Sequence, residues 1–115
     1  MNLTVGLILV VFLLFAVTGT VKIVGLSASL KIRDHLGLPP RLWQVVGALE
    51  TSGAIGTLVG LWYRPLGIAA TAGLAALMLG AIVSRLRVRD TVLAVLSDVL
   101  VLAVVTTLLV LYALA

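Results

Sequence analysis

Long apolar segments alternate with short polar segments along the chain. Four stretches made mainly of Leu, Val, Ala and Gly are each about 20 residues long, the length at which an α-helix crosses a bilayer. The pattern predicts transmembrane helices at about residues 3–25, 42–62, 65–84 and 91–113. β-Strands are not expected, because the apolar runs are continuous and do not alternate with polar residues.

The three connections between these helices differ in length. The first, residues 27–41, reads SASLKIRDHLGLPPR, and we expect it to lie at the membrane interface because leucine and isoleucine alternate with charged side chains. Gly37 and Pro39 should end any helix within it. The second is the tight turn WYRP, whose Pro65 suits the first position of the next helix. The third, RLRVRD, ends at Asp90, which we expect to cap the fourth helix.

The composition argues against a soluble domain. Of the 115 residues, 63% are hydrophobic and 10% are charged, and the mean hydropathy is +1.33. A soluble chain of this length could not bury so much apolar surface. The sequence therefore predicts a single integral membrane domain, residues 1–115, folded as an all-α four-helix bundle with a short interfacial segment between helices 1 and 2. The chain has no cysteine, which excludes disulfides and thiolate chemistry.

Basic residues are concentrated in two of the connections. The first and third connections carry six Lys and Arg residues, whereas the second carries only Arg64. The six are Lys31, Arg33, Arg41, Arg85, Arg87 and Arg89. The positive-inside rule then predicts a multi-pass protein of the cell membrane with both termini outside. The net charge of +4 fits this orientation and contact with anionic lipid headgroups, and does not indicate nucleic-acid binding; an anionic-ligand site is the alternative interpretation.

Small residues recur every four positions in two neighbouring helices. One ridge consists of Ala48, Ser52, Gly56 and Gly60, and the other of Ala72, Ala76, Gly80 and Ser84. Such ridges let helix backbones approach closely in lipid. We expect the two ridges to face each other within one chain. The alternative is that one ridge faces a second protomer in a homo-oligomer.

Three ionisable residues lie inside three of the predicted helices. Glu50 and Asp98 each lie about eight residues from the same side of the membrane, and Lys22 lies near that end of the first helix. A charge at mid-helix costs about 2.5 to 3.5 kcal/mol on insertion scales, so each is expected to have a partner or a wet cavity. Lys22 is the expected partner of one carboxylate, and Arg85 is within reach of the other.

Glu50 is expected to face an internal polar pocket. It shares a helix face with Trp43, Gly47, Ala54 and Thr57, away from the ridge of small residues. The other members of the predicted cluster are Lys22, Asp98, Thr18, Gln44 and Arg85, with Thr51 and Ser97 near the same depth. An ion-pair network that only fixes the helix register is the alternative interpretation, and Lys22 alone could extend to the interface. His35 is expected to be solvated, and no metal-binding constellation or nucleophile–base pair is recognisable.

The order and spacing of several motifs resemble one family of membrane proteins. GTVKIVG contains Lys22 at the end of the first helix, and downstream follow LGLP, the G-x-x-E of Gly47 and Glu50, RPLG, and LMLGA before a basic loop. Over about residues 18–90 the chain resembles the DoxX-like family of small four-helix membrane proteins. The resemblance implies a four-helix bundle. A histidine of the family pattern is replaced here by Ser84–Arg85, so chemistry that depends on that histidine is not implied.

The resemblance and the predicted pocket lead to three functional hypotheses. DoxX-like relatives are linked to thiosulfate:quinone oxidoreduction and to oxidative-stress or chaperone-like roles. This implies a binding protein for a quinone-like or other lipophilic molecule, or an accessory subunit of a partner redox protein. No intrinsic cofactor is expected, because the chain has no cysteine and one histidine. A proton-coupled exporter of lipophilic cations is the second hypothesis, although the first helix contains no acid, and a purely structural or assembly protein is the third.

Overall fold

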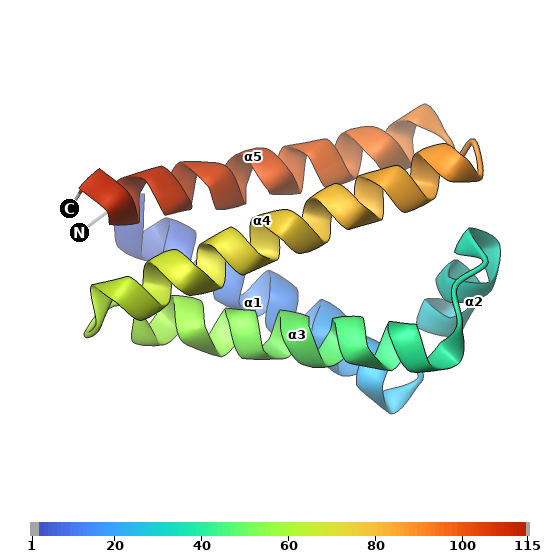
Figure 1. The fold of residues 1–115 in the computed structure, drawn as a ribbon, viewed down its shortest axis with the longest axis horizontal. Helices are drawn as coiled ribbons and strands as arrows, with labels where there is room; N and C mark the ends of the chain where they lie inside the picture. The colour runs from blue at the N-terminus through green and yellow to red at the C-terminus, as the bar shows by residue number, and fades with distance from the viewer. Residues whose placement is uncertain (1–2, 115) are drawn as a thin grey trace.

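Five α-helices make up most of residues 3–114, the part of the chain that the computed structural model describes (Figure 1). They are α1 (Leu3–Val24), α2 (Ser27–Leu36), α3 (Pro40–Val59), α4 (Arg64–Arg87) and α5 (Val92–Leu114). The predicted all-α class is confirmed. The expected number of helices changes from four to five within the described residues, because the interfacial connection itself folds into α2, a helix of 10 residues.

Three of the described helices are long and apolar enough to cross a membrane. They are α1, α4 and α5. α3 is not among them, since its 20 residues include Arg41, Gln44 and Glu50 as well as several small side chains. The prediction of a transmembrane helix at residues 42–62 therefore stays a prediction.

The helices form two pairs that meet at one end of the molecule. α1 packs along α3 and α4 packs along α5, and the pairs contact each other through α3 with α4 and α1 with α5. α3 and α4 diverge from their connecting turn, so the pairs separate toward α2 (Figure 1). We call this the α2 end, and the opposite end, where α1 begins and α5 ends, the turn end. The buried apolar core consists of Ile8, Val11, Phe15, Ala54, Leu74, Met78, Val105, Leu108 and Tyr112.

Two pairs of glycines mark the closest approaches between helices. A Cβ added to Gly19 would lie 2.6 Å from the carbonyl oxygen of Gly47, so α1 and α3 meet backbone to backbone there. At the turn end, a Cβ added to Gly60 would lie 2.6 Å from the Cα of Gly67. The absence of side chains at these positions is what lets the helix axes come close in an apolar medium.

The expected contact between the two ridges of small residues is only half present. Gly56 of the first ridge does lie against α4, because a Cβ there would be 2.8 Å from the Cβ of Ala70. The second ridge does not face it. Ala72 and Ala76 are exposed, and no atom of residues 3–114 outside α4's own neighbouring backbone lies within 4 Å of a Cβ on Gly80. α4 instead turns Ala70 and Leu74 toward α3, where they lie against Gly56 and Gly53. Nearer α2, the divergence of the two helices leaves Gly80 far from α3.

Thr91, and not Asp90, caps α5. The Thr91 Oγ1 accepts the backbone N–H of Ala94 at 3.2 Å, and α5 begins at Val92. Asp90 instead accepts the backbone N–H of Thr91 at 2.8 Å and turns its other oxygen toward Arg85. The correction has a simple cause, since threonine also makes a good N-cap and Asp90 has a cationic partner available.

α2 ends at Gly37, as the sequence predicts. Gly37 has a left-handed backbone with φ 69°, and its N–H donates to the carbonyl of Asp34 while that of Leu38 donates to Arg33. These bonds close the helix in the manner of a glycine C-cap. The chain then turns at once into α3, which keeps α2 beside the end of α1.

Candidate functional site

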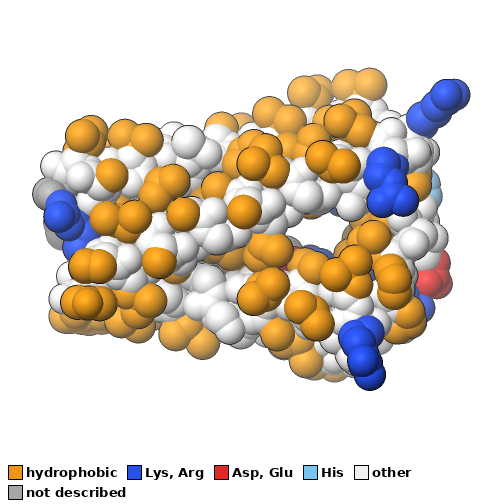
Figure 2. Space-filling model, in the orientation of Figure 1, with side chains coloured by type: hydrophobic (Ala, Val, Ile, Leu, Met, Phe, Trp, Pro, Cys, Tyr) orange, Lys and Arg blue, Asp and Glu red, His pale blue; other side chains and the backbone are white. Residues whose placement is uncertain are grey.

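A cavity of about 620 Å³ lies between the two helix pairs, on the α2 side of the core. Its lining is mostly apolar and includes residues of all five helices. Figure 2 shows an opening between α3 and α4 at this place. The polar residues among those that line the cavity are Thr18, Lys22, Ser29, Glu50, Ser84, Arg85, Ser97 and Asp98.

One wall carries a buried ion pair between α1 and α3. The Lys22 Nζ lies 2.7 Å from the Glu50 Oε1, and the two side chains are only 15% and 7% exposed. The Thr18 hydroxyl donates to the Glu50 Oε2 at 2.5 Å. Thr18 and Lys22 are one helical turn apart and therefore share a face of α1. Each oxygen of this carboxylate thus has a partner on the neighbouring helix.

The glycine contact between α1 and α3 explains why Lys22 can reach Glu50. A Cβ added to Gly47 would lie 2.8 Å from the Cβ of Lys22, so the lysine stem runs directly over this glycine. Glu50 lies about one turn further along α3, and its carboxylate contacts the ammonium group of Lys22. The face of α3 predicted to carry Glu50 is confirmed, since Trp43, Gly47, Ala54 and Thr57 are all buried with it.

Trp43 extends this wall to α2. The Lys22 Nζ lies 4.9 Å from the centre of the Trp43 ring, within the range of a cation–π interaction. The indole Nε1 donates to the Ser29 Oγ at 2.9 Å, and both side chains are buried. Sequence reasoning missed this bond. The signal for it was a tryptophan on the same face as Glu50, because a buried indole N–H needs an acceptor.

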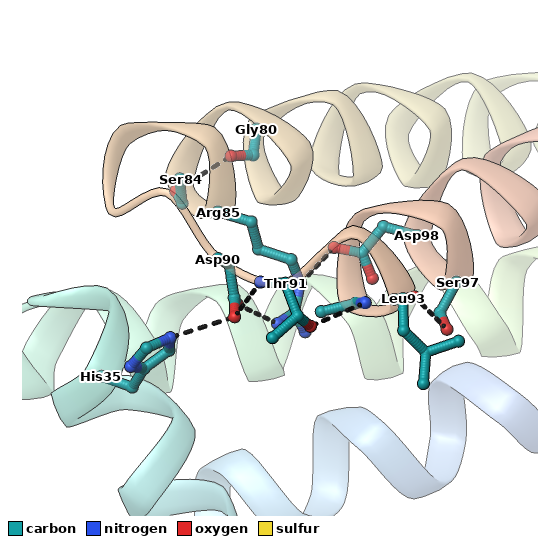
Figure 3. Close-up of polar contacts among 10 residues, drawn as sticks. His35, Gly80, Ser84, Arg85, Asp90, Thr91, Leu93, Ser97 and Asp98 are labelled. Carbon is teal, nitrogen blue, oxygen red and sulfur yellow. Dashed lines mark hydrogen bonds and ion pairs between the residues drawn. The ribbon is translucent and has the colours of Figure 1, made fainter.

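The other wall carries an arginine between two carboxylates. Figure 3 shows the Arg85 side chain reaching from α4 to Asp98 of α5 and to Asp90 in the connection. The Arg85 Nε lies 2.6 Å from the Asp98 Oδ2, and its Nη1 lies 2.8 Å from the Asp90 Oδ2. The Asp90 Oδ1 in turn lies 3.1 Å from the Nε2 of His35 in α2.

Asp90 is the charged residue on which these contacts converge. The backbone N–H of Thr91 lowers the pKa of the Asp90 carboxyl most, and Arg85 and His35 lower it further by hydrogen bonds to the charged form. Asp90 is therefore a carboxylate at neutral pH. His35, expected to be simply solvated, is half exposed at 54% of its side chain but reaches this carboxylate.

The predicted cluster is thus divided between two walls. Thr18, Lys22 and Glu50 form one group, and Arg85 and Asp98 form the other. Gln44 belongs to neither, because it is exposed on α3 and does not line the cavity. That the remaining residues act as a functional site stays a prediction.

The two walls together offer hydrogen-bond donors beside apolar surface. An ammonium carries three N–H groups and a guanidinium five. Lys22 directs one toward Glu50, and Arg85 directs two toward its carboxylates, so donor capacity remains for acceptor oxygens. Within residues 3–114, no group of three or more His, Cys, Asp and Glu residues has the arrangement of a metal site.

Comparison with known proteins gives one match. Residues 6–108, nearly the whole chain, match the family model described as the DoxX-like family. No curated protein and no solved structure matches.

Proposed function

Since the chain belongs to the DoxX-like family, whose members are membrane proteins, we propose that it binds a lipophilic, quinone-like molecule in the cavity between its helix pairs. The observation that carries this proposal is the composition of the cavity wall, an apolar surface interrupted by one ion pair on each side. Pockets for small molecules commonly measure about 300–1,000 Å³ and combine apolar lining with a few fixed polar groups.

The proposal includes α3 as a fourth transmembrane helix. α3 leads from the α2 end to the turn before α4, and α4 is long and apolar enough to span. Twenty residues at about 1.5 Å each give roughly 30 Å, the thickness of the hydrocarbon core. Glu50, the charge that makes this helix less apolar, is paired with Lys22 and turned away from lipid. The resulting bundle has four spanning helices, with α2 at the interface.

The chemistry of the two walls favours a ligand head with acceptor oxygens. Lys22 and Arg85 lie on opposite walls, and each has N–H groups beyond those used by its carboxylates. Carbonyl oxygens of a quinone ring accept hydrogen bonds and carry no charge to desolvate. The aliphatic tail would lie against the apolar lining contributed by residues such as Leu14, Phe15 and Leu77. With no cysteine and one histidine in the chain, electron exchange with such a ligand would require a partner redox protein.

Trp43 provides the means to test binding. It lines the cavity, whereas the chain's other tryptophan, Trp62, is 78% exposed outside it. In the Trp62→Phe variant, a short-chain ubiquinone analogue should quench the Trp43 fluorescence in a saturable manner. In the Trp43→Phe variant, the quenching of Trp62 should rise linearly with concentration, as expected for partition into the membrane or micelle.

Two further results would decide between the hypotheses. Arg85→Gln in the Trp62→Phe background should weaken the saturable quenching, because it removes donors from one wall. Linear quenching in both single-tryptophan variants would refute the cavity as a quinone site. Saturable quenching by a lipophilic cationic dye, but not by the quinone, would instead support the exporter hypothesis.

A further inference from the structure

The two helix pairs are joined in different ways at the two ends of the cavity. At the turn end, the backbones of Gly60 and Gly67 touch, and the Tyr112 hydroxyl donates to the carbonyl of Thr57 at 2.5 Å. At the α2 end, the pairs have separated, and α2 reaches across to the α4–α5 connection through His35 and Asp90. One end is therefore held by close packing and the other by a half-exposed polar contact.

We propose that α2 is a strap over the open end of the cavity, and that protonation of His35 tightens its contact with Asp90. The strap closes when His35 carries a second proton and loosens when His35 is neutral; histidine is the side chain whose charge can change within the physiological range of pH. The control of ligand exchange rests on the proposed binding function, whereas the movement of α2 does not.

The position of α2 supports its role as a strap. Its residues Ala28, Ser29 and Ile32 line the cavity, so α2 forms part of the wall. Ser29 fixes it to α3 through Trp43, on the first helix pair. His35, six residues further along α2, makes the contact with the second pair. α2 is thus hydrogen-bonded to one side of the cavity and in polar contact with the other.

The charges around His35 make its contact sensitive to protonation. On the second helix pair and its connection, one guanidinium, Arg85, faces two carboxylates, Asp90 and Asp98, which leaves one negative charge in excess. A protonated His35 supplies the balancing positive charge. A neutral His35 makes only a polar contact with Asp90 and leaves the excess negative charge uncompensated.

The remaining charged groups near this end do not reverse that effect. On α2 itself, Arg33 pairs with the neighbouring Asp34 at 2.9 Å, so the two add no net charge. Lys31, Arg87 and Arg89 are exposed, and water and salt screen their repulsion of a protonated His35. The partly buried contact between Arg85 and the carboxylates is screened less.

The movement can be measured directly because the chain contains no cysteine. Lys31→Cys on α2 and Arg87→Cys at the end of α4 place two spin labels at exposed positions on either side of the contact. In lipid nanodiscs without added ligand, the distance distribution between the labels should move to longer values between pH 5.5 and pH 8.5. His35→Gln in this background should give the long distribution at both pH values.

Two control variants separate this contact from general effects of pH. Asp90→Asn should also give the long distribution throughout, because it removes the charge that His35 faces. Asp34→Asn changes an acid on the same helix that pairs with Arg33, and it should leave the shift intact. An unchanged distribution between the two pH values, or a shift that persists in His35→Gln, would overturn the strap.

The rate of quinone binding links the strap to the site. Stopped-flow quenching of Trp43 by the ubiquinone analogue should be several-fold faster at pH 8.5 than at pH 5.5, and the difference should vanish in His35→Gln. If the labels move and no saturable quinone binding occurs, the proposed function fails and the strap stands. If quinone binds at a rate independent of pH and the labels do not move, the strap fails and the binding function stands.

Discussion

The ammonium of Lys22 lies 2.7 Å from the carboxylate of Glu50 and joins α1 to α3 in the interior of the protein. Thr18 completes the contact from the same helix as the lysine. Each of these charges would be costly to bury alone in hydrocarbon, and their pairing offsets the cost of both. The closeness of α1 and α3 at Gly19 and Gly47 is the packing feature that permits it.

Removing the lysine should cost more than neutralising the acid. Lys22→Met leaves a buried carboxylate without its cation, which should lower the free energy of unfolding by about 3 kcal/mol. Glu50→Gln keeps the shape of the side chain and leaves a lysine that can extend toward the interface, so its loss should be smaller. The double variant should recover part of the loss of Lys22→Met. Denaturation in detergent of all four proteins measures the coupling, and strictly additive losses would contradict a direct pair.

The glycine that supports this pair should not tolerate even a methyl group. A Cβ at position 47 would lie 2.8 Å from both the Gly19 carbonyl oxygen and the Lys22 Cβ. Gly47→Ala should therefore destabilise the fold by about 1 to 3 kcal/mol through overpacking. Gly80→Ala is the matched control, because open space surrounds that position and no loss is expected. Equal thermal stability of the two variants would rule out the close approach of α1 and α3.

Tyr112 should stabilise the turn end through its hydroxyl group. The carbonyl of Thr57 lies in the last turn of α3, where helix carbonyls lack a helical N–H, and the tyrosine hydroxyl donates to it. Tyr112→Phe keeps the ring against Gly60 and Gly67 and removes only this bond. The free energy of unfolding should fall by about 1 to 3 kcal/mol. The exposed Tyr63→Phe serves as the control, and an equal effect of both changes would contradict the assignment.

Asp90 should make stability fall in acid. Because the pKa of its carboxyl is lowered in the folded protein below the ordinary value of 3.8, the folded state favours the charged form. This contribution is fully present above that value and is lost as the pH falls through the lower folded pKa. Asp90→Asn should therefore reduce stability near pH 6 and flatten its decline below about pH 4. Unfolding midpoints measured from pH 6 to pH 3 test this, and parallel curves for the two proteins would contradict it.

Both termini should lie on the side of the membrane opposite to α2. Basic side chains gather around the α2 end in Figure 2, and this asymmetry predicts that end to be cytoplasmic. A labelling reagent needs an exposed position on α2. Lys31 is exposed, whereas Ser29 is buried against Trp43, so we choose Lys31 for the cysteine. A membrane-impermeant maleimide should label Leu114→Cys in intact cells and Lys31→Cys only after permeabilisation. Labelling of Lys31→Cys in intact cells would reverse the orientation.

Much of the architecture could be read from local patterns along the chain. The long apolar runs predict helices because a backbone in hydrocarbon must satisfy its own hydrogen bonds. Gly37 ends α2 for a reason that is local to one residue, its left-handed backbone. The burial of Glu50 with Trp43 and Gly47 follows from helical periodicity, which places them on one face of α3. Each of these features depends on residues within a few turns of one another.

Contacts between distant segments depended on the angles at which the helices pack. The sequence predicts Lys22 and Arg85 as partners of two acids, but it does not say which cation pairs with which acid. Because α1 packs against α3, Lys22 pairs with Glu50, and because α4 packs against α5, Arg85 pairs with Asp98. The divergence of α3 from α4 left Gly80 without a neighbour, although its spacing matched that of Gly56. Periodicity gives the face of a helix and the depth of a residue, but not the distance between two helix axes.

The contact between His35 and Asp90 is the clearest example of a feature that local patterns do not predict. Neither residue's own segment indicates the other as its partner, since one lies in a polar helix and the other in a basic connection. They meet at 3.1 Å because the helix pairs open toward α2 and the C-cap at Gly37 holds that helix across the gap. The amino-acid sequence alone determines which side chains each segment carries and which face of a helix they occupy. The packing of the two helix pairs determines which of these side chains meet, because contact between two helices depends on the distance and angle between their axes.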